Sequence, residues 1–98
     1  MASIVVPCYN AERYLRRTLE SALAQTMGDF ELICVDNNST DKTPELLEEC
    51  AAADSRVRVL SESEPGEGPA RDAGLKRARG RWAYFLDSDD LMEPTLLE

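Results

Sequence analysis

The chain has 98 residues, a formal net charge of -8 and no histidine. Its 43% hydrophobic and 31% charged residues are typical of one globular domain, and no apolar stretch approaches the ~20 residues that cross a bilayer. The acidic balance argues against nucleic acid as a partner, because phosphate contacts need a concentrated positive surface. Without histidine, catalysis of the Ser/His/Asp or Cys/His type is excluded.

The three cysteines, Cys8, Cys34 and Cys50, are odd in number and show no CxxC spacing. This pattern argues against a disulfide framework and against the common zinc sites. We therefore expect free thiols in the core and a reducing compartment. That compartment is the cytoplasm, with the inner face of the membrane as an option for a longer parent protein.

The chain begins with a strand pattern followed by a helix pattern. A β-branched run at 3–6 ends at Pro7 and predicts a buried strand. From Ala11 onward apolar residues recur at three- and four-residue spacing, which predicts a helix. Asn10 is placed to cap the start of this helix, and Gly28 to end the segment.

The middle of the chain repeats the alternation. Residues 30–35 form a second apolar run, and a polar loop follows at 36–41. Thr43 and Pro44 are typical of a cap and a first helical turn, so we expect a second helix to begin there. The run 56–60 alternates apolar and charged residues, which predicts a strand at an exposed edge.

The last part of the chain predicts one more helix and one more strand. Residues 62–68 have a loop composition, 70–79 predict a short helix rich in small residues, and 81–86 predict a fourth strand. The order β-α-β-α-β-α-β predicts an α/β fold, a Rossmann-like three-layer α/β/α arrangement around a mostly parallel four-stranded sheet. The strand 81–86 would lie at an apolar edge that favours a homodimer through strand pairing, or aggregation.

Polar clusters follow three of the four expected strands, at 7–10, 36–41 and 87–90. In a parallel sheet ligands bind beyond the carboxyl ends of the strands. The three clusters are therefore expected to converge on one rim. No P-loop motif is present to suggest a different phosphate site.

The last cluster crowds three carboxylates together. Asp87, Ser88 and Asp89 form a DxD motif of hard oxygen ligands suited to Mg²⁺ or Mn²⁺. A bare DxD is also common on ordinary acidic surfaces, so the motif alone does not decide for a metal. Since like charges repel, a cation must offset the cluster, and Arg71 is the first candidate within the protein.

Three further side chains are candidates for a nucleotide site. Asp36 can accept hydrogen bonds from a base or a ribose, although Asp at this place also favours a turn. Tyr9 offers a ring for stacking on a base, or packs in the core. Arg71 can meet a diphosphate through charge-assisted hydrogen bonds, together with the first-turn amides of its helix.

Four segments together resemble a known family. They are SIVVPCYN (3–10), LICVDNNSTDKT (32–43), GPARDAGLKRARGRW (68–82) and YFLDSDD (84–90). In this order and spacing they resemble the nucleotide-binding half of family 2 glycosyltransferases, which have the GT-A fold. The resemblance covers nearly the whole chain, and it implies transfer of a sugar from a nucleotide diphosphate donor, usually UDP-linked, with inversion at the anomeric carbon.

The resemblance also implies roles for single residues. Pro7 and Tyr9 would line the base pocket, and Asp36 would bind the uracil edge. Arg71 would lie near the base and the diphosphate. Asp87 would hold the ribose.

The metal and the catalytic base are implied in the same way. Asp89 would bind the divalent cation, Mg²⁺ or Mn²⁺. In the family a further half supplies the acceptor site and the carboxylate that takes the proton from the acceptor hydroxyl, and we expect that base downstream of Glu98. Residues 1–98 are therefore expected to be the nucleotide-sugar-binding half of a glycosyltransferase domain that binds nucleotide but does not transfer sugar alone. Whether the acceptor is a saccharide or a lipid-linked group stays open.

Three positions depart from the common family pattern. Asn37 and Asn38 stand where the family usually has Asp and Gly, and Asp72 stands where it has Asn. Asn38 is acceptable because Asn adopts left-handed backbone more readily than most residues. Asn37 removes one negative charge and puts any role of a second carboxylate there in doubt. Asp72 would weaken the hold of Arg71 on phosphate.

Two alternatives to the transferase stay open. Phosphatases of the haloacid dehalogenase type also place DxD after an apolar strand, with the first Asp as nucleophile, which would be Asp87 here. Their motif continues to Thr or Val where this chain has Leu91, which argues against them. The second alternative is a nucleotide-binding module without catalysis.

Overall fold

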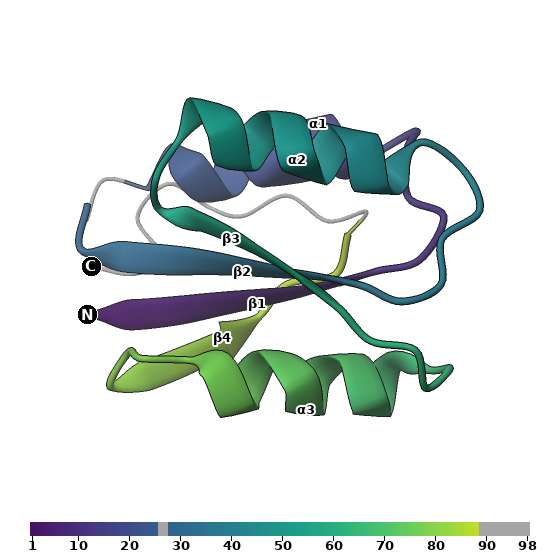
Figure 1. Ribbon diagram of the computed structural model, residues 1–98. Coiled ribbons are helices and arrows are strands. Elements are labelled where there is room, and N and C mark those ends of the chain that lie inside the picture. The colour runs from purple at the N-terminus through teal and green to yellow at the C-terminus, as the bar shows by residue number, and fades with distance from the viewer. Residues whose placement is uncertain (26–27, 89–98) are drawn as a thin grey trace.

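The computed structural model describes residues 1–25 and 28–88, in which strands and helices alternate (Figure 1). The strands are β1 (Ala2–Cys8), β2 (Phe30–Asp36), β3 (Val57–Ser61) and β4 (Trp82–Phe85), and the helices are α1 (Leu15–Leu23), α2 (Thr43–Ala53) and α3 (Glu67–Arg77). The strands pair in parallel in the order β3-β2-β1-β4. Helices α1 and α2 cover one face of the sheet and α3 covers the other (Figure 1). The predicted three-layer α/β fold is confirmed.

The central strands β1 and β2 are buried on both faces. Every residue of β1 is buried, and β1 pairs with β2 from Ala2 opposite Phe30 to Cys8 opposite Asp36. Because successive side chains of a strand point to opposite faces, each strand feeds two cores. Ile4 packs toward the core of α1 and α2, whereas Val5 packs toward the core of α3. A continuous apolar run is the expected pattern for such a strand.

Small residues bring α3 close to the sheet, as their frequency in this segment predicts. Ala70 and Gly74 are the buried residues of α3. A Cβ atom on Gly74 would collide with the side chain of Val5. The close contact therefore leaves room for glycine alone at this position.

The edges of the sheet are β3 and β4. The edge position of β3 agrees with its alternating sequence. On β4 the side chains of Trp82 and Phe85 are 58% and 47% exposed. The predicted apolar edge is thus present among the described residues. No helix within residues 1–25 and 28–88 has the length and apolar character needed to span a membrane.

Helix α1 begins at Leu15 and not at Ala11, so the predicted start is wrong. Asn10 does not cap this helix, whose N-cap is Tyr14 without a side-chain cap bond. The backbone amide of Ala11 donates instead to Oγ1 of Thr43 at 2.9 Å. A contact to the first residue of α2 therefore replaces the local cap, and the chain makes a turn before it becomes helical.

Thr43 has a different role from the one predicted. It is the first residue of α2, and the N-cap is Lys42. Pro44 does lie in the first turn, where its missing N–H costs nothing. The hydroxyl of Thr43 accepts a hydrogen bond from the segment after β1 and does not cap its own helix.

Helix α3 begins at Glu67, three residues before the predicted start at Ala70. The sequence prediction placed the helix after Pro69, but proline is tolerated in a first helical turn because the amides there have no partner within the helix. Gly66 precedes the helix with a φ of 116°, a backbone region that favours glycine.

Two predicted helix ends also lie too far along the chain. Helix α1 ends at Leu23 and not near Gly28, and α3 ends at Arg77 and not at Arg79. The amide of Arg79 donates to the side chain of Glu31 at 2.6 Å, so it has left the helical hydrogen-bond pattern.

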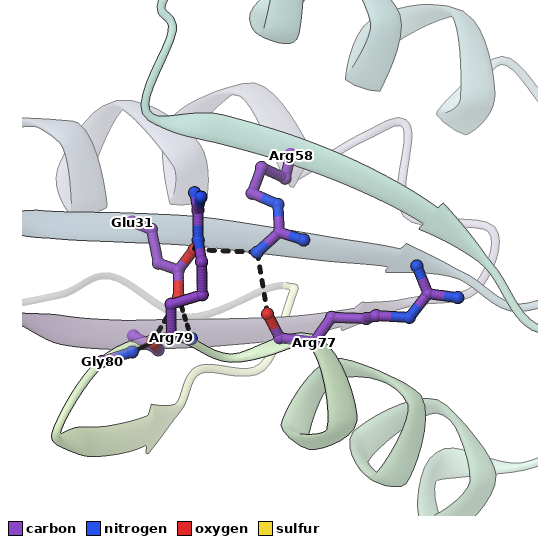
Figure 2. Close-up of polar contacts among 6 residues, drawn as sticks. Glu31, Arg58, Arg77, Arg79 and Gly80 are labelled. Carbon is purple, nitrogen blue, oxygen red and sulfur yellow. Dashed lines mark hydrogen bonds and ion pairs between the residues drawn. The ribbon is translucent and has the colours of Figure 1, made fainter.

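Glu31 is a buried carboxylate at the amino-terminal end of the sheet (Figure 2). Its side chain is 4% exposed. Oε2 accepts from the hydroxyl of Ser3 and from the amide of Arg79, both at 2.6 Å, and Oε1 accepts from Nη1 of Arg58 at 2.9 Å. The sequence pattern places Glu31 only in an apolar strand and does not predict this cluster.

The Glu31 cluster fixes the turn between α3 and β4. The amide of Gly80 donates to Oγ of Ser3 at 2.8 Å, and Arg58 also donates to the carbonyl of Arg77 at 2.8 Å (Figure 2). Burial alone would raise the pKa of Glu31. Hydrogen bonds from Ser3, from the Arg79 amide and from Arg58 outweigh burial and lower the pKa to about 2.

The lowered pKa of Glu31 predicts a loss of stability in acid. The unshifted value is 4.5, so the contribution is complete above that pH and is lost as the pH falls toward about 2. We expect Glu31→Gln to reduce the free energy of unfolding at neutral pH by about 3 kcal/mol, because a shift of one pKa unit corresponds to about 1.4 kcal/mol. Urea unfolding measured between about pH 7 and pH 3 tests this.

Glu48→Gln is the matched control, because Glu48 is exposed on α2. The difference in stability between wild type and Glu31→Gln should shrink in acid, whereas that for Glu48→Gln should stay small throughout. A constant difference for Glu31→Gln would contradict the assigned ionisation.

Candidate functional site

A cavity of about 1060 Å³ lies at the carboxyl ends of the strands. Its volume suits a ligand of nucleotide size. The strand ends and the segments that follow them line it: residues 7–8 at the end of β1 and 9–11 after it, Asn37 and Asn38 after β2, Ser63, Pro65 and Gly66 after β3, and Asp87 and Ser88 after β4. The predicted convergence of three loops is confirmed. The loop after β3 was missed, although parallel pairing brings its end to the same rim.

Five of the residues predicted for the site lie in the described part of the chain. Pro7, Tyr9 and Asp87 line the cavity. Asp36 and Arg71 do not line it, but each is next in the chain to a lining residue. The structure therefore brings three of the five directly to the cavity.

The aromatic rings at the cavity are exposed. Tyr9 is 63% exposed, so packing in the core, one of its two predicted roles, is wrong. Tyr14 also lines the cavity and is 45% exposed, a place that the sequence pattern did not predict. An exposed ring at a cavity offers a surface for stacking.

Two buried polar atoms next to the cavity lack partners among residues 1–25 and 28–88. They are Oδ1 of Asp36 and Nε of Arg71. Leaving such an atom unpaired costs about 1–3 kcal/mol, so native proteins rarely do so without a reason. A ligand that supplies one donor and one acceptor would remove both costs.

Arg71 lies close to the acidic cluster, as charge balance predicts. Its Nη2 is 3.7 Å from Oδ1 of Asp87 and 3.7 Å from Oε1 of Glu67. Its guanidinium carbon is 5.7 Å from the centre of the Phe85 ring. Both ion pairs are longer than a hydrogen bond and partly exposed, so they hold Arg71 weakly.

The donor set for a metal is incomplete in the described part of the chain. Within residues 1–25 and 28–88 no group of three or more His, Cys, Asp or Glu side chains is placed to hold a metal ion. Asp87 brings one hard oxygen donor to the cavity. The predicted metal ligand Asp89 lies outside the described residues. The metal site therefore stays a prediction.

Cys8 lines the cavity but is not a candidate nucleophile. Burial raises the pKa of its thiol to about 12, and the negative charge of Asp36 adds to the shift. At neutral pH the thiol is protonated, and only the thiolate is reactive. Cys8, Cys34 and Cys50 are all free, and the first two are buried as predicted.

Two asparagines at the cavity adopt left-handed backbone. Asn10 has a φ of 47° and Asn38 a φ of 63°, which confirms the prediction for Asn38. Oδ1 of Asn10 accepts from the amide of Thr40 at 2.7 Å, and the Asn10 amide donates to Oγ of Ser39 at 3.0 Å. Asn10 thus joins the loops after β1 and β2.

Asn37 is a site residue that sequence analysis considered only for its missing charge. It is 6% exposed. Its Nδ2 donates to the carbonyls of Glu62 and Glu64 at 2.8 and 2.7 Å, and its Oδ1 accepts from the amide of Gly66 at 2.9 Å. A polar side chain directly after an apolar strand was the available signal.

A parallel α/β sheet with a partly polar cavity beyond its strand ends defines the class of open α/β domains that bind ligands at this edge of the sheet. The model of the family Glycosyl transferase family 2 matches residues 3–98, and the chain belongs to this family.

Two relatives show how much of a whole protein the chain represents. EpsH of Bacillus subtilis (strain 168) is 42% identical over 96 residues, which are 98% of this chain and 28% of EpsH. Chondroitin synthase of Escherichia coli is 41% identical over 98 residues, which are 100% of this chain and 14% of that protein. The chain thus spans under a third of the length of either relative.

Two solved structures are similar in fold. The structure of S. aureus TarS 1-349 in complex with UDP superposes with a TM-score of 0.86 and 33% identity, over 98% of this chain and 29% of that one. The mannosyltransferase PcManGT from Pyrobaculum calidifontis, in complex with GDP-Man and Mn²⁺, gives a TM-score of 0.84 and 26% identity, over 92% of this chain and 28% of that one. The predicted match to part of a GT-A glycosyltransferase is confirmed.

The left-handed backbone at Asn10 predicts different costs for two substitutions. Asn10→Ala removes the acceptor of the Thr40 amide and keeps a Cβ in left-handed backbone, so we expect a loss of about 1–2 kcal/mol. Asn10→Gly loses the same acceptor but relieves the backbone, so we expect a smaller loss, under about 1 kcal/mol. Urea unfolding of both variants measures the difference. Equal losses would show that the backbone at Asn10 carries no cost.

Proposed function

We propose that the chain forms the donor-binding part of a glycosyltransferase that moves a sugar from a nucleotide diphosphate to an acceptor hydroxyl with inversion. UDP is the proposed nucleotide. The observation that carries the proposal is the cavity at the four strand ends, which has exposed tyrosines and Asp87 on its walls. Membership of the glycosyltransferase family and the UDP bound to TarS support the choice of ligand.

The base is proposed to bind between the ends of β1 and β2. Pro7 and Tyr9 supply apolar and aromatic surface there. Oδ1 of Asp36 is buried and lacks a described donor, so it is available to accept from an N–H of the base. A buried acceptor discriminates strongly against ligands that bring no donor.

The ribose and the diphosphate are proposed to bind between α3 and the end of β4. Asp87 would accept from the ribose hydroxyls. Among the described residues the ion pairs of Arg71 are 3.7 Å long and its further contact is with the Phe85 ring, so its guanidinium is available for charge-assisted hydrogen bonds to phosphate. Asp72 is exposed on α3 and has no described contact with Arg71, which leaves Arg71 free to turn toward a ligand.

Asp89 is proposed to hold Mg²⁺ or Mn²⁺. When bound, the metal would offset the negative charge that grows on the departing diphosphate. The Mn²⁺ present with GDP-Man in PcManGT supports this proposal.

The complete reaction is proposed for a protein of the length of the relatives. The base that takes the proton from the acceptor is expected beyond residues 1–98, and so is the site for a saccharide or lipid-linked acceptor. Free thiols support a cytoplasmic location for this part of the protein. The exposed edge β4 is a proposed site for strand pairing, either with further sequence or with a second copy.

Nucleotide binding predicts specific changes in an NMR titration. With Mg²⁺ present, UDP should shift the amide resonances of Tyr9, Asp36, Arg71 and Asp89 more than those of the amino-terminal sheet end. Repeating the titration without metal measures the metal dependence, which should disappear in Asp89→Asn. Asp72→Asn is the matched control, because it removes one exposed carboxylate of α3 outside the cavity.

Two outcomes would contradict the proposal. If UDP, GDP and dTDP all leave the spectrum unchanged at millimolar concentration with metal, the chain has no nucleotide site. If a phosphoester yields an aspartyl-phosphate on Asp87, or beryllium fluoride forms the corresponding beryllofluoride adduct there, the phosphatase alternative is favoured.

The unpaired oxygen of Asp36 predicts opposite effects on stability and binding. Asp36→Asn keeps the shape of the side chain but replaces its charge. We expect the free energy of unfolding to stay within about 0.5 kcal/mol of wild type or to rise, because no described donor bonds Oδ1. UDP affinity should fall about tenfold, since one hydrogen bond to a charged group is worth about 1.5–3 kcal/mol. Calorimetry and urea unfolding measure the two quantities. Unchanged affinity would remove Asp36 from the base site.

A further inference from the structure

The loop between β3 and α3 forms one wall of the cavity, and a single buried side chain spans it. Nδ2 of Asn37 donates to the carbonyls of Glu62 and Glu64, and Oδ1 accepts from the amide of Gly66. Asn37 therefore contacts both ends of this loop, which lies about 25 residues further along the chain.

This contact joins two proposed parts of the nucleotide site. Asn37 directly follows Asp36 at the end of β2, and its own amide donates to the carbonyl of Cys8 at 2.8 Å. Gly66 is the N-cap of α3, the helix that carries Arg71. The position of the α3 start relative to the ends of β1 and β2 thus depends on the Asn37 side chain.

In this chain the contact uses two donors and one acceptor of one short side chain, so this loop is matched to Asn at the position where the resembling family usually has Asp. Asparagine has this set, whereas an ionised aspartate has acceptors alone. An aspartate at position 37 would face two carbonyl oxygens at the 2.7–2.8 Å now bridged by Nδ2. Its charged form would be disfavoured there, so its pKa would rise. Once protonated, it could again donate one hydrogen bond.

We propose that Asn37 is a positioning residue for the donor nucleotide: it holds the wall from Ser63 to Gly66 and the start of α3 at the separation that the ligand requires. The inference rests on the proposed nucleotide site. Asn37 acts through the loop. The neighbouring Asn38, whose Nδ2 donates to the carbonyl of Ser63 at 3.0 Å, makes one exposed contact to the same loop.

Asn37→Asp tests the proposal through the pH dependence of binding. Calorimetric titration with UDP and Mg²⁺ should show affinity about tenfold below wild type near pH 7, since two buried hydrogen bonds are lost. At about pH 5 the ratio to wild type should recover to within about threefold, because the protonated side chain donates again. Asn37→Ala should lose affinity about equally at both pH values. It introduces no buried charge, so it remains a test if Asn37→Asp fails to fold.

Hydrogen exchange gives a second readout that needs no nucleotide. The protection factor of the Gly66 amide should fall in Asn37→Asp near pH 7 and recover toward pH 5. Asn38→Asp is the matched control, because it adds the same charge one residue away and keeps the buried contacts. It should lose less affinity than Asn37→Asp, and its ratio to wild type should not recover at lower pH.

The outcomes separate this inference from the proposed function. If wild type binds UDP and Asn37→Asp binds equally well near pH 7, Asn37 has no positioning role. If Asn37→Asp and Asn38→Asp lose affinity equally and neither recovers, added charge explains the effect and the inference is wrong. If wild type binds no nucleotide, the proposed function fails and the inference fails with it.

Discussion

The buried carboxylate of Glu31 is the interaction on which the arrangement of the sheet depends. It connects β2 to β1, to β3 and to the turn after α3 through hydrogen bonds from Ser3, Arg58 and Arg79. That turn sets where β4 joins β1, with Trp82 opposite Ala2. Because β4 then runs in fixed register along β1, Asp87 arrives at the cavity at the other end of the sheet. A structural acid at one end therefore determines where Asp87 meets the cavity at the other end.

Most of the fold follows from local patterns, and two errors in its helix bounds share one cause. Apolar runs such as 30–35 identify the strands, because a strand buried on both faces consists almost entirely of apolar residues. The predicted start of α1 and the predicted end of α3 were wrong where a distant group satisfies the backbone. Ala11 donates to Thr43, 32 residues away, and Arg79 donates to Glu31, 48 residues away. Such partners leave no periodic trace in the sequence.

The candidate site was predictable to the extent that it follows strand ends. Pro7, Tyr9 and Asp87 occupy the cavity because parallel strands deliver their carboxyl ends to one rim. Tyr14 and Asn37 were missed for a different reason. Their positions depend on a turn and on a loop folded back from residues 62–66, and these contacts exist only in three dimensions. The resemblance to the family directed attention to the charge at Asn37, whereas the hydrogen-bond donors of its amide explain its burial.

The separation of the two ends of the sheet has a consequence for how such a domain can change. Each wall of the cavity comes from the loop after a different strand, while the polar network around Glu31 lies at the opposite ends of the same strands (Figures 1 and 2). Substitutions in one loop can alter the ligand without disturbing that network. The scaffold and the specificity of the domain can therefore evolve independently, one loop at a time.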